Sequence, residues 1–287
     1  MSETLGLIYV ILSGAGFGFL GVFGRWGYQS GLSIGELLSF RFILASAVFW
    51  IGLLLTKPQL TKLPLKEIII SSSLGVFGYA VFSTLYFKSI EGISVALAAL
   101  LLFTFPIFVN LGAHFLFKER MSRHQFLSLI LACVGLLILL WGPLVVSSLN
   151  AVFYALMAAI TYSIYVLISG QYQRHVNPLS SSLYIITATA FSLVLFHQPS
   201  LIKITELSYE QIWIIVGIAL VSTIAPLTLF LAGLQKLSSS KASIVVMIEP
   251  VVATLAGWVL LGEQLSGLQL IGALLVLLAL LLTRKNN

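Results

Sequence analysis

The chain consists of ten apolar runs, each close to the length that crosses a bilayer as an α-helix. About 20 consecutive apolar residues span the hydrocarbon core of a membrane, and the longest gap between runs covers only residues 198–209. The runs cover residues 5–24, 35–56, 67–87, 93–117, 124–141, 150–170, 179–197, 210–234, 241–261 and 267–283. We therefore predict an all-α polytopic membrane protein with ten transmembrane helices.

Composition supports a membrane protein and argues against a nucleic-acid partner. Of the 287 residues, 59% are hydrophobic and 8% are charged, whereas soluble domains carry about 25% charged residues. A β-barrel would need alternating strands of about 10 residues, and these runs are uniformly apolar. The net charge of +6 comes from basic residues scattered in short gaps. Because they form no patch, we expect contact with the lipid bilayer and none with nucleic acid.

Lysine and arginine are distributed unevenly between alternating gaps. Three lie in odd-numbered gaps, namely Arg25, Lys88 and Lys203. Eleven lie in even-numbered gaps and the C-terminal tail: Lys57, Lys62, Lys66, Lys118, Arg120, Arg123, Arg174, Lys236, Lys241, Arg284 and Lys285. By the positive-inside rule, the even gaps and both termini face the cytoplasm. We expect a multi-pass protein of the cytoplasmic (inner) membrane.

The second half of the chain repeats the pattern of the first. A shift of 144 residues lays "FPIFVNLGAHFLFKER" over "EPVVATLAGWVLLGEQ". The superposed pairs are Pro106 with Pro250, Gly112 with Ala256, Glu119 with Glu263, Gln125 with Gln269, Tyr86 with Phe230 and Ser94 with Ser238. Each half holds five helices, and because five is odd the second half enters the membrane from the opposite side. We predict two inverted repeats, residues 1–145 and 146–287.

These features resemble a known family of carriers. The ten-helix plan, "SFRFILA" in the second run, and prolines followed by "KERMS" and "LGEQLS" are similar to the drug/metabolite transporter superfamily, in particular its EamA-like branch. The resemblance covers essentially the whole chain. It implies a secondary carrier with a central cavity lined mainly by helices 1, 3, 4, 6, 8 and 9, with helices 5 and 10 peripheral. It implies no particular substrate.

The first half departs from the family pattern at two positions. Lys118 stands in place of the glycine before Glu119, and Phe105 in place of the acid before Pro106. Only the second half could therefore carry the Glu-Pro function.

Signatures of soluble enzymes are absent or out of context. Gly16, Gly18 and Gly21 fit G-x-G-x-x-G, but a dinucleotide site needs a strand before the glycines and a helix after them. Close helix packing explains Gly14 and Gly18 better. All nine acidic residues are Glu, so no Ser-His-Asp triad is possible, and the four histidines lack metal-ligand spacing. We expect no enzyme activity, no metal and no cofactor. A membrane-embedded enzyme and a non-transporting receptor or assembly subunit remain as alternatives.

The ninth run places Glu249 beside Pro250 in the middle of a membrane span. A proline removes a backbone hydrogen bond, so we expect kinks at Pro106 and Pro250 in the fourth and ninth helices. A charge in hydrocarbon is costly, and we expect Glu249 to face the protein interior. Two interpretations are open: the carboxyl group donates a hydrogen bond to the carbonyl of Val246, or it gains and loses a proton during transport.

Other polar residues of the predicted helices are candidates for the same interior. Arg41 either binds an anionic group of the substrate or reaches the interface or a carbonyl group. Asn110 and His114 are one turn apart and face either the cavity or a neighbouring helix. Four tyrosines are placed near the cavity by the resemblance, with helix packing or interfacial anchoring as the alternative: Tyr79, Tyr86, Tyr162 and Tyr165.

We therefore expect a secondary carrier that exports small organic metabolites of amino-acid-like or amphipathic character. Protons or a second substrate would drive transport. The resemblance, rather than any residue pattern, carries the direction and the coupling. The expected partners are a small-molecule substrate, protons and lipid, with a homodimer left open.

Overall fold

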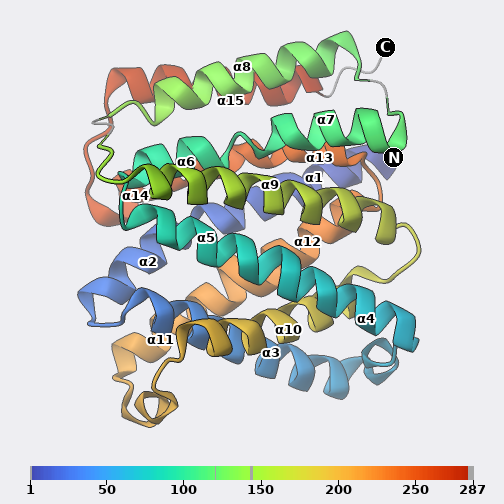
Figure 1. The fold of residues 1–287 in the computed structure, drawn as a ribbon, viewed down its shortest axis with the longest axis vertical. Helices are drawn as coiled ribbons and strands as arrows, with labels where there is room; N and C mark the ends of the chain where they lie inside the picture. The colour runs from blue at the N-terminus through green and yellow to red at the C-terminus, as the bar shows by residue number, and fades with distance from the viewer. Residues whose placement is uncertain (1, 120, 143–144, 284–287) are drawn as a thin grey trace.

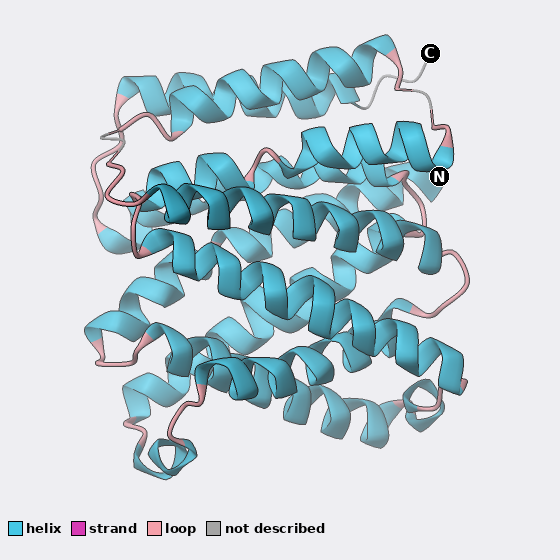
Figure 2. Ribbon diagram, in the orientation of Figure 1, coloured by secondary structure: helices cyan, strands magenta, loops and turns pink. Residues whose placement is uncertain are grey.

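The protein is helical throughout its described parts. The structure is a computed structural model that describes residues 2–119, 121–142 and 145–283. Within these ranges, paired extended backbone is limited to one isolated bridge between Ile93 and Val146 (Figure 2). The predicted all-α polytopic fold is therefore confirmed. The repeat limits 1–145 and 146–287 stay a prediction, and residues 1 and 287 lie outside the described ranges.

The helices follow the predicted runs closely. Those of the first half are α1 (Ser2–Gly18), α2 (Leu20–Gln29), α3 (Ile34–Thr56), α4 (Leu65–Ser73), η2 (Leu74–Ala80), α5 (Val81–Ile90), α6 (Val95–Leu102), α7 (Phe105–Phe117) and α8 (Arg123–Leu139). Those of the second half are α9 (Leu149–Tyr172), α10 (Pro178–His197), α11 (Tyr209–Ala219), η4 (Leu220–Ile224), α12 (Ala225–Leu234), α13 (Ser239–Val245), η5 (Val246–Ile248), α14 (Glu249–Leu261) and α15 (Gly267–Thr283). Short 3-10 turns η1 (Pro58–Thr61) and η3 (Leu201–Glu206) lie in loops.

Eight helical segments of the described chain are long and apolar enough to cross a membrane, and α8 and α15 are shorter apolar helices. Several segments are built from consecutive elements: α1–α2, α4–η2–α5, α6–α7, α11–η4–α12 and α13–η5–α14. The helices lie side by side (Figure 1). The α8–α15 pair forms one edge of the molecule and the α3–α10 pair the opposite edge, with the other helices between them.

The superposed positions of the two halves adopt the same local structure. Ser94 and Ser238 each cap a helix by accepting a hydrogen bond from a backbone amide three residues later. The loops before α8 and α15 both form capping boxes, Ser122 with Gln125 and Ser266 with Gln269. Such reciprocal side-chain and backbone bonds satisfy amides at a helix start. The internal repeat in the sequence thus corresponds to repeated helix boundaries.

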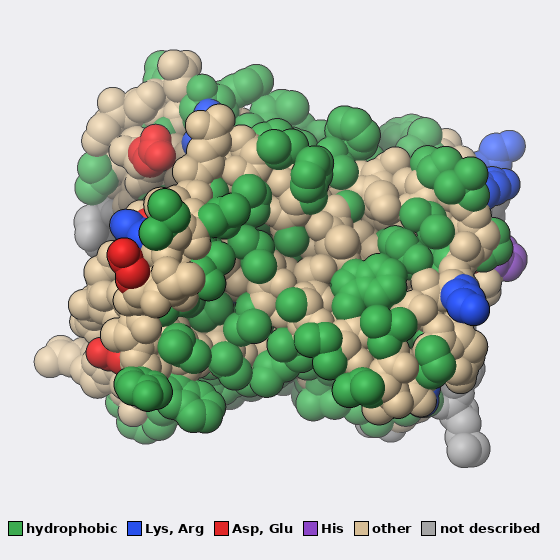
Figure 3. Space-filling view, turned by 90° about the horizontal axis from the view of Figure 1, so that it is seen from below, with side chains coloured by type: hydrophobic (Ala, Val, Ile, Leu, Met, Phe, Trp, Pro, Cys, Tyr) green, Lys and Arg blue, Asp and Glu red, His purple; other side chains and the backbone are tan. Residues whose placement is uncertain are grey.

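Charged side chains gather at the two ends of the helices. Figure 3 shows hydrophobic side chains over the middle of one side of the molecule and charged groups toward its ends. We name the end with the α3–α4, α7–α8, α9–α10 and α12–α13 loops the basic face, and the other end the opposite face. Ion pairs are Arg174–Glu119 and Lys241–Glu3 at the basic face, and Arg25–Glu263 and Lys203–Glu36 at the opposite face. Arg120, Arg284 and Lys285 of the predicted charge bias lie outside the described residues.

Helices α7 and α14 end in the same way with different residues. Lys118 (φ 55°) and Gly262 (φ 67°) both have left-handed backbone conformations. The following amides, of Glu119 and Glu263, donate to carbonyls six residues earlier at 3.1 and 3.2 Å. Glycine adopts this conformation without strain, whereas other residues lose roughly 1–2 kcal/mol. The sequence departure at Lys118 therefore costs stability in the first half.

We predict that Lys118→Gly stabilises the protein by about 1 kcal/mol, because it removes this strain while keeping the helix end. Thermal unfolding of the purified protein in detergent measures the effect as a raised melting temperature. Gly262→Ala is the matched control and should lower it, since no atom lies within 4 Å of the added Cβ and only backbone strain changes. An unchanged or lower melting temperature for Lys118→Gly would contradict the left-handed helix end.

Candidate functional site

The α13–η5–α14 segment is interrupted where Pro250 lacks an amide hydrogen. Pro250 lies in the first turn of α14, and the three residues before Glu249 form the 3-10 helix η5. The Glu249 amide donates to the carbonyl of Val246, the carbonyl that Pro250 cannot serve. The backbone itself therefore satisfies this carbonyl. The carboxyl group of Glu249 makes no hydrogen bond to it, so the interpretation of this group as a plug for the break lacks support.

Glycines of α1 bring its backbone against this break. A Cβ added to Gly14 would lie 2.5 Å from Ile248 Cγ2 and 3.1 Å from the Val246 carbonyl oxygen. A Cβ added to Gly18 would lie 2.9 Å from the Glu249 carbonyl oxygen. These glycines serve close helix packing, in agreement with the packing interpretation of the glycine pattern. As a result, α1 holds the start of α14 in place.

The equivalent break in the first half lies between α6 and α7. Pro106 lies in the first turn of α7, and the Ser163 hydroxyl of α9 donates to the Phe105 carbonyl at 3.0 Å. Asn110 Nδ2 donates to the Pro106 carbonyl at 2.7 Å. Phe105 takes the position that Glu249 has in the second half. The two breaks are therefore similar in backbone, but only the second carries a carboxyl group.

The carboxyl group of Glu249 has no polar partner in the described parts of the chain. No ion pair or hydrogen bond joins it to another residue. Its side chain is partly accessible although it lies midway along a membrane span. The hydroxyl groups of Tyr79, Tyr86 and Tyr162 lie within electrostatic range of it. Glu249 thus has three tyrosines of two other helical segments within electrostatic range.

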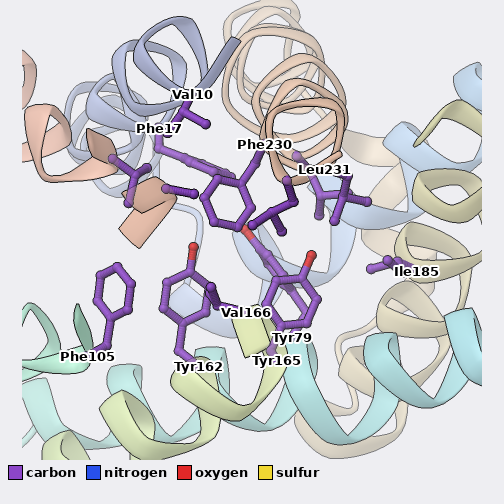
Figure 4. Close-up of a cluster of buried hydrophobic side chains, with 14 of the residues drawn as sticks. Val10, Phe17, Tyr79, Phe105, Tyr162, Tyr165, Val166, Ile185, Phe230 and Leu231 are labelled. Atoms are coloured by element: carbon purple, nitrogen blue, oxygen red, sulfur yellow. The ribbon is translucent and has the colours of Figure 1, made fainter. Parts of the chain in front are cut away.

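Aromatic rings connect two of these tyrosines, Tyr79 and Tyr162, across three helical segments. Ring centroids lie 4.8 Å apart for Tyr79 and Phe82, 4.6 Å for Phe82 and Tyr162, and 4.7 Å for Phe105 and Tyr162. Figure 4 shows Tyr162 extending from α9 toward the side chains of Phe230 and Phe17 on the other side of the cluster. Two of these pairs are edge-to-face and the Phe82–Tyr162 pair is tilted, and such ring pairs favour a fixed arrangement of the rings. The aromatic cluster therefore forms a rigid apolar wall beside Glu249.

Arg41 is a second unpaired charge in the interior. Its side chain is 5% exposed, and the guanidinium carbon lies 4.7 Å from the centre of the Phe42 ring. Arg41 Nε has no hydrogen-bond partner, and no ion pair or hydrogen bond of Arg41 occurs among the described residues. Tyr79 lies within electrostatic range. Arg41 therefore makes no hydrogen bond to a carbonyl group among the described residues.

These observations bring together five of the eight predicted polar site residues, which we name the interior polar group: Arg41, Tyr79, Tyr86, Tyr162 and Glu249. Tyr165 contacts this group through its ring, which stacks on Tyr162 at 5.8 Å. It is 1% exposed and its hydroxyl group has no hydrogen-bond partner among the described residues, so its ring packs the wall. Asn110 is buried and bonds to the Pro106 carbonyl, with its Oδ1 atom unpartnered.

His114 does not belong to the interior. It is exposed, and its Nδ1 atom lies 3.2 Å from the carbonyl oxygen of Glu119. Although Asn110 and His114 are one turn apart, the helix turns His114 outward while Asn110 stays buried. The expectation that they share one inward face is therefore wrong for His114.

Sequence reasoning missed two π-helical turns, η2 and η4, which lie at superposed positions of the two halves. Tyr79 lies in η2, and the Ser222 hydroxyl of η4 donates to the Gly16 carbonyl of α1 at 2.8 Å. A Cβ added to Gly75 of η2 would lie 2.5 Å from the Ile185 carbonyl oxygen. Such turns often occur at functional sites. In the sequence, the glycines of the third apolar run were the available signal for the first of these π-helical turns.

The two halves differ in how tightly they are buried. All seven residues of α13 are buried, whereas only Ala98 is buried in its counterpart α6. Likewise α12 buries most of its residues, and α5 buries only Ser83 and Ser89. At the basic face α13 packs against α7, but α6 and α14 make no comparable contact at the opposite face. The interior polar group is thus covered toward the basic face and less covered toward the opposite face.

Two shallow cavities lie elsewhere. One of about 370 Å³ is lined by Phe23, Trp26, Glu210, Trp213 and Ile214. The other, of about 400 Å³, is lined by residues on both sides of the α8 start, from Met121 to Leu127. Neither includes a member of the interior polar group. Among the described residues no three His, Cys, Asp or Glu side chains come together in a way that could hold a metal ion.

Comparison with known proteins identifies the family. A family model described as the EamA-like transporter family matches residues 4–141 and, separately, residues 149–284. The chain belongs to this family. The suspected resemblance is thereby confirmed, and each of the two matches covers five apolar helical segments.

Several relatives carry the word transporter in their names. The uncharacterized transporter YcbK of Bacillus subtilis is 24% identical and covers 93% of this chain and 88% of its own length. The uncharacterized transporter YoaV of the same organism is 27% identical, with 77% of this chain and 76% of its own length covered. A solved crystal structure, 18% identical, has a TM-score of 0.81 and covers 99% of this chain and 96% of that one. This last likeness supports the fold alone.

We predict that a reactive probe reaches the interior from the opposite face more easily than from the basic face. Tyr86 is partly accessible, whereas its counterpart Phe230 is 2% exposed. In a Cys133→Ala background, Tyr86→Cys should react with a water-soluble maleimide at least about tenfold faster than Phe230→Cys, because exposed thiolates react preferentially. Mass spectrometry of the purified protein in detergent measures both rates. Equal rates would contradict the asymmetry between the halves.

Proposed function

We propose that this EamA-family membrane transporter is a secondary carrier. It moves small organic metabolites of amino-acid-like or amphipathic character across the cytoplasmic membrane, in the direction of export. Family membership and the names of the relatives support transport. Alternating access of the interior polar group to the two faces is the proposed mechanism, and exchange of protons or of a second substrate is the proposed driving force.

The observation that carries this proposal is the unpartnered Glu249 carboxyl group. A polar or charged side chain within a membrane span is costly unless another group offsets the cost. The glutamates of the described chain that do form ion pairs lie at its two faces, and their partners are Arg25, Arg174, Lys203 and Lys241. Glu249 instead keeps an accessible carboxyl group beside three tyrosine hydroxyl groups. Such a group is suited to bind a proton and a substrate cation in turn.

The asymmetric burial of the two halves supports alternating access. Helices α12 and α13 cover the interior polar group toward the basic face, while α5 and α6 leave it less covered toward the opposite face. In an inverted repeat, the second state follows when each half adopts the arrangement of the other. Closure of α6 against α14 and separation of α13 from α7 would then expose the group to the basic face. If the basic face is cytoplasmic, the present structure is open to the outside.

The break at Pro250 provides a hinge directly beside Glu249, the residue proposed to bind the proton and the substrate. Because α14 begins at Glu249, a change in the angle between α13 and α14 moves the carboxyl group with little change elsewhere in the segment. Backbone carbonyls at the break are already satisfied, so bending there opens fewer hydrogen bonds than bending a continuous helix. Proline-broken segments near the middle of the membrane are typical of transporter binding sites.

We predict that Glu249→Gln lowers the transport rate by roughly tenfold or more and removes its pH dependence, while leaving folded yield normal. Glutamine keeps the size and polarity of glutamate but cannot gain or lose a proton. A charged hydrogen bond contributes about 1.5–3 kcal/mol, so the rate should fall by roughly tenfold or more. The measurement is metabolite release from cells expressing wild type or variant, followed by counterflow of the identified metabolite in proteoliposomes at several pH values.

Glu263→Gln is the matched control for this substitution. It makes the same chemical change at the other end of α14, where the ion pair with Arg25 is about half exposed and contributes little. It should transport with normal pH dependence. Glu249→Ala should lower transport as Glu249→Gln does. Normal, pH-dependent transport by Glu249→Gln would refute the role of this carboxyl group.

A further inference from the structure

A cavity between α2 and α11 lies at the opposite face, away from the interior polar group, and we name it the α2–α11 cavity. Its volume is about 370 Å³, and its lining consists of three aromatic side chains, one glutamate and one isoleucine: Phe23, Trp26, Trp213, Glu210 and Ile214. The first two belong to α2 of the first half and the other three to α11 of the second half. The cavity therefore lies where the two repeats meet.

Contacts between α2 and α11 hold the walls of this cavity in place. The Phe23 and Trp26 rings meet edge to face, with centroids 5.8 Å apart and an interplanar angle of 83°. A Cβ added to Gly217 would lie 2.5 Å from Phe23 Cε1, so the Phe23 ring packs against the backbone of α11. Gln211 Nε2 donates to the Ser30 carbonyl at 2.8 Å and joins the start of α11 to the residue after α2. The cavity is thus bounded by packed helices.

The carboxylate of Glu210 has no cationic partner in the described parts of the chain. The residue is exposed, and its side chain makes no ion pair or hydrogen bond there. The cations of the neighbouring elements α2 and η3 are paired with other glutamates: Arg25 with Glu263 at 2.7 Å and Lys203 with Glu36 at 2.6 Å. Glu210 is therefore available for a cation that the chain itself does not supply.

Aromatic rings beside a carboxylate are suited to bind an ammonium group. The face of an aromatic ring is negative and attracts cations, and cages of several rings recognise quaternary ammonium ligands. Trp213 follows Glu210 by three residues on α11, so its ring and the carboxylate share one side of the helix. An anionic group would be repelled by both. The lining of the α2–α11 cavity therefore selects a cationic group.

The apolar surface next to the cavity indicates that this cationic group belongs to a lipid. Trp213 is 72% exposed, and Gly217 and Leu220 follow it on the same side of the helix, one and two turns further on. Leu220 is 42% exposed. This strip runs from the opposite face toward the middle of the membrane span, as an acyl chain does below its headgroup. The order of carboxylate, rings and apolar strip matches the order of ammonium group and acyl chain in a lipid.

We propose that the α2–α11 cavity binds the ammonium headgroup of a zwitterionic phospholipid, an ethanolamine or choline lipid. The Glu210 carboxylate pairs with the ammonium group, the rings contact the carbon atoms around its nitrogen, and an acyl chain lies along α11. Because the lining comes from both repeats, the bound lipid stabilises the contact between them. The inference does not depend on the carrier function, since lipid binding is measured without transport.

Native mass spectrometry of the purified full-length protein in an uncharged detergent tests the proposal by measuring the affinity for the first bound lipid. The probes are dioleoylphosphatidylethanolamine, dioleoylphosphatidylcholine and the ethanolamine lipid with its amino group acetylated, which removes its positive charge. We expect Glu210→Gln and Trp213→Leu each to bind the two ammonium lipids at least about fivefold more weakly than wild type, because an ion pair or a cation–π contact is lost. The acetylated lipid should bind equally to all three proteins. Unchanged affinity of both variants for the ammonium lipids would overturn the proposal.

Glu206→Gln and Trp141→Leu are the matched controls. Glu206 is exposed and precedes α11, and Trp141 follows α8 at the opposite face and is 72% exposed, as Trp213 is. Neither residue lines the cavity, so both controls should bind all three lipids as wild type does. Trp213→Phe keeps an aromatic ring and should retain part of the affinity, which guards against a folding defect in Trp213→Leu. An equal loss of affinity in the controls would indicate a general interfacial effect and overturn the assignment.

Other occupants of the cavity give different results in the same experiment. Glycerophosphocholine and glycerophosphoethanolamine carry the headgroups without acyl chains, and we expect them to displace the bound lipid only at far higher concentration. Displacement at equal concentration would assign the cavity to a soluble ammonium compound and overturn the lipid. The spectra also report the oligomeric state. A dimer that is lost in Trp213→Leu would assign the cavity to a second copy of the chain and likewise overturn the lipid.

Discussion

The arrangement of the interior depends on one missing amide hydrogen, that of Pro250. Without it the ninth membrane segment cannot continue as a regular helix, and the chain forms the 3-10 turn η5 before α14 begins at Glu249. The glycines of α1 pack directly against this turn, on the side chains of Ile248 and Val252 and on the carbonyl groups of Val246 and Glu249, so little space is left for the turn to shift. The carboxyl group of Glu249 is thereby held at mid-membrane, facing tyrosines of η2, α5 and α9 without a partner of its own.

Because the two halves are pseudo-symmetric, the positions at which they differ are informative. The superposed segments share a serine cap at their start and a proline at their break, but Phe105 stands at the position equivalent to Glu249, and its ring packs on Tyr162. One half thus supplies a charge and the other an apolar wall. The halves also differ in packing, since α13 is wholly buried while α6 is mostly accessible. Equivalent elements of the two repeats thus adopt two different local arrangements. Alternating access requires that each repeat can change from one arrangement to the other.

Much of the fold could be predicted from the sequence, because the lengths of the apolar runs indicate membrane helices and the repeated prolines indicate where these helices are interrupted. The ten runs follow from such patterns, and the sequence motifs carry the resemblance to the family, which in turn implied the interior placement of the tyrosines. The π-helical turns do not, since any single glycine is compatible with an ordinary helix and the turns arise from contacts with α1, α9 and α10. The outward position of His114 also depends on which side of α7 meets its neighbours. For Glu249 the sequence left two roles open, a structural carboxyl group at the break and a proton-exchanging one; the bond between the Glu249 amide and the Val246 carbonyl, which arises from the fold, shows that the backbone satisfies this carbonyl.

The central claim is that the Glu249 carboxyl group is unpaired and exchanges a proton in the interior of the membrane. Infrared difference spectroscopy of the protein in proteoliposomes, recorded as the pH is changed, observes the C=O stretch of a protonated carboxyl group directly. We predict a band that appears and disappears with pH in wild type and in Glu263→Gln and that is missing in Glu249→Gln. An identical set of carboxyl bands in wild type and Glu249→Gln would contradict the claim.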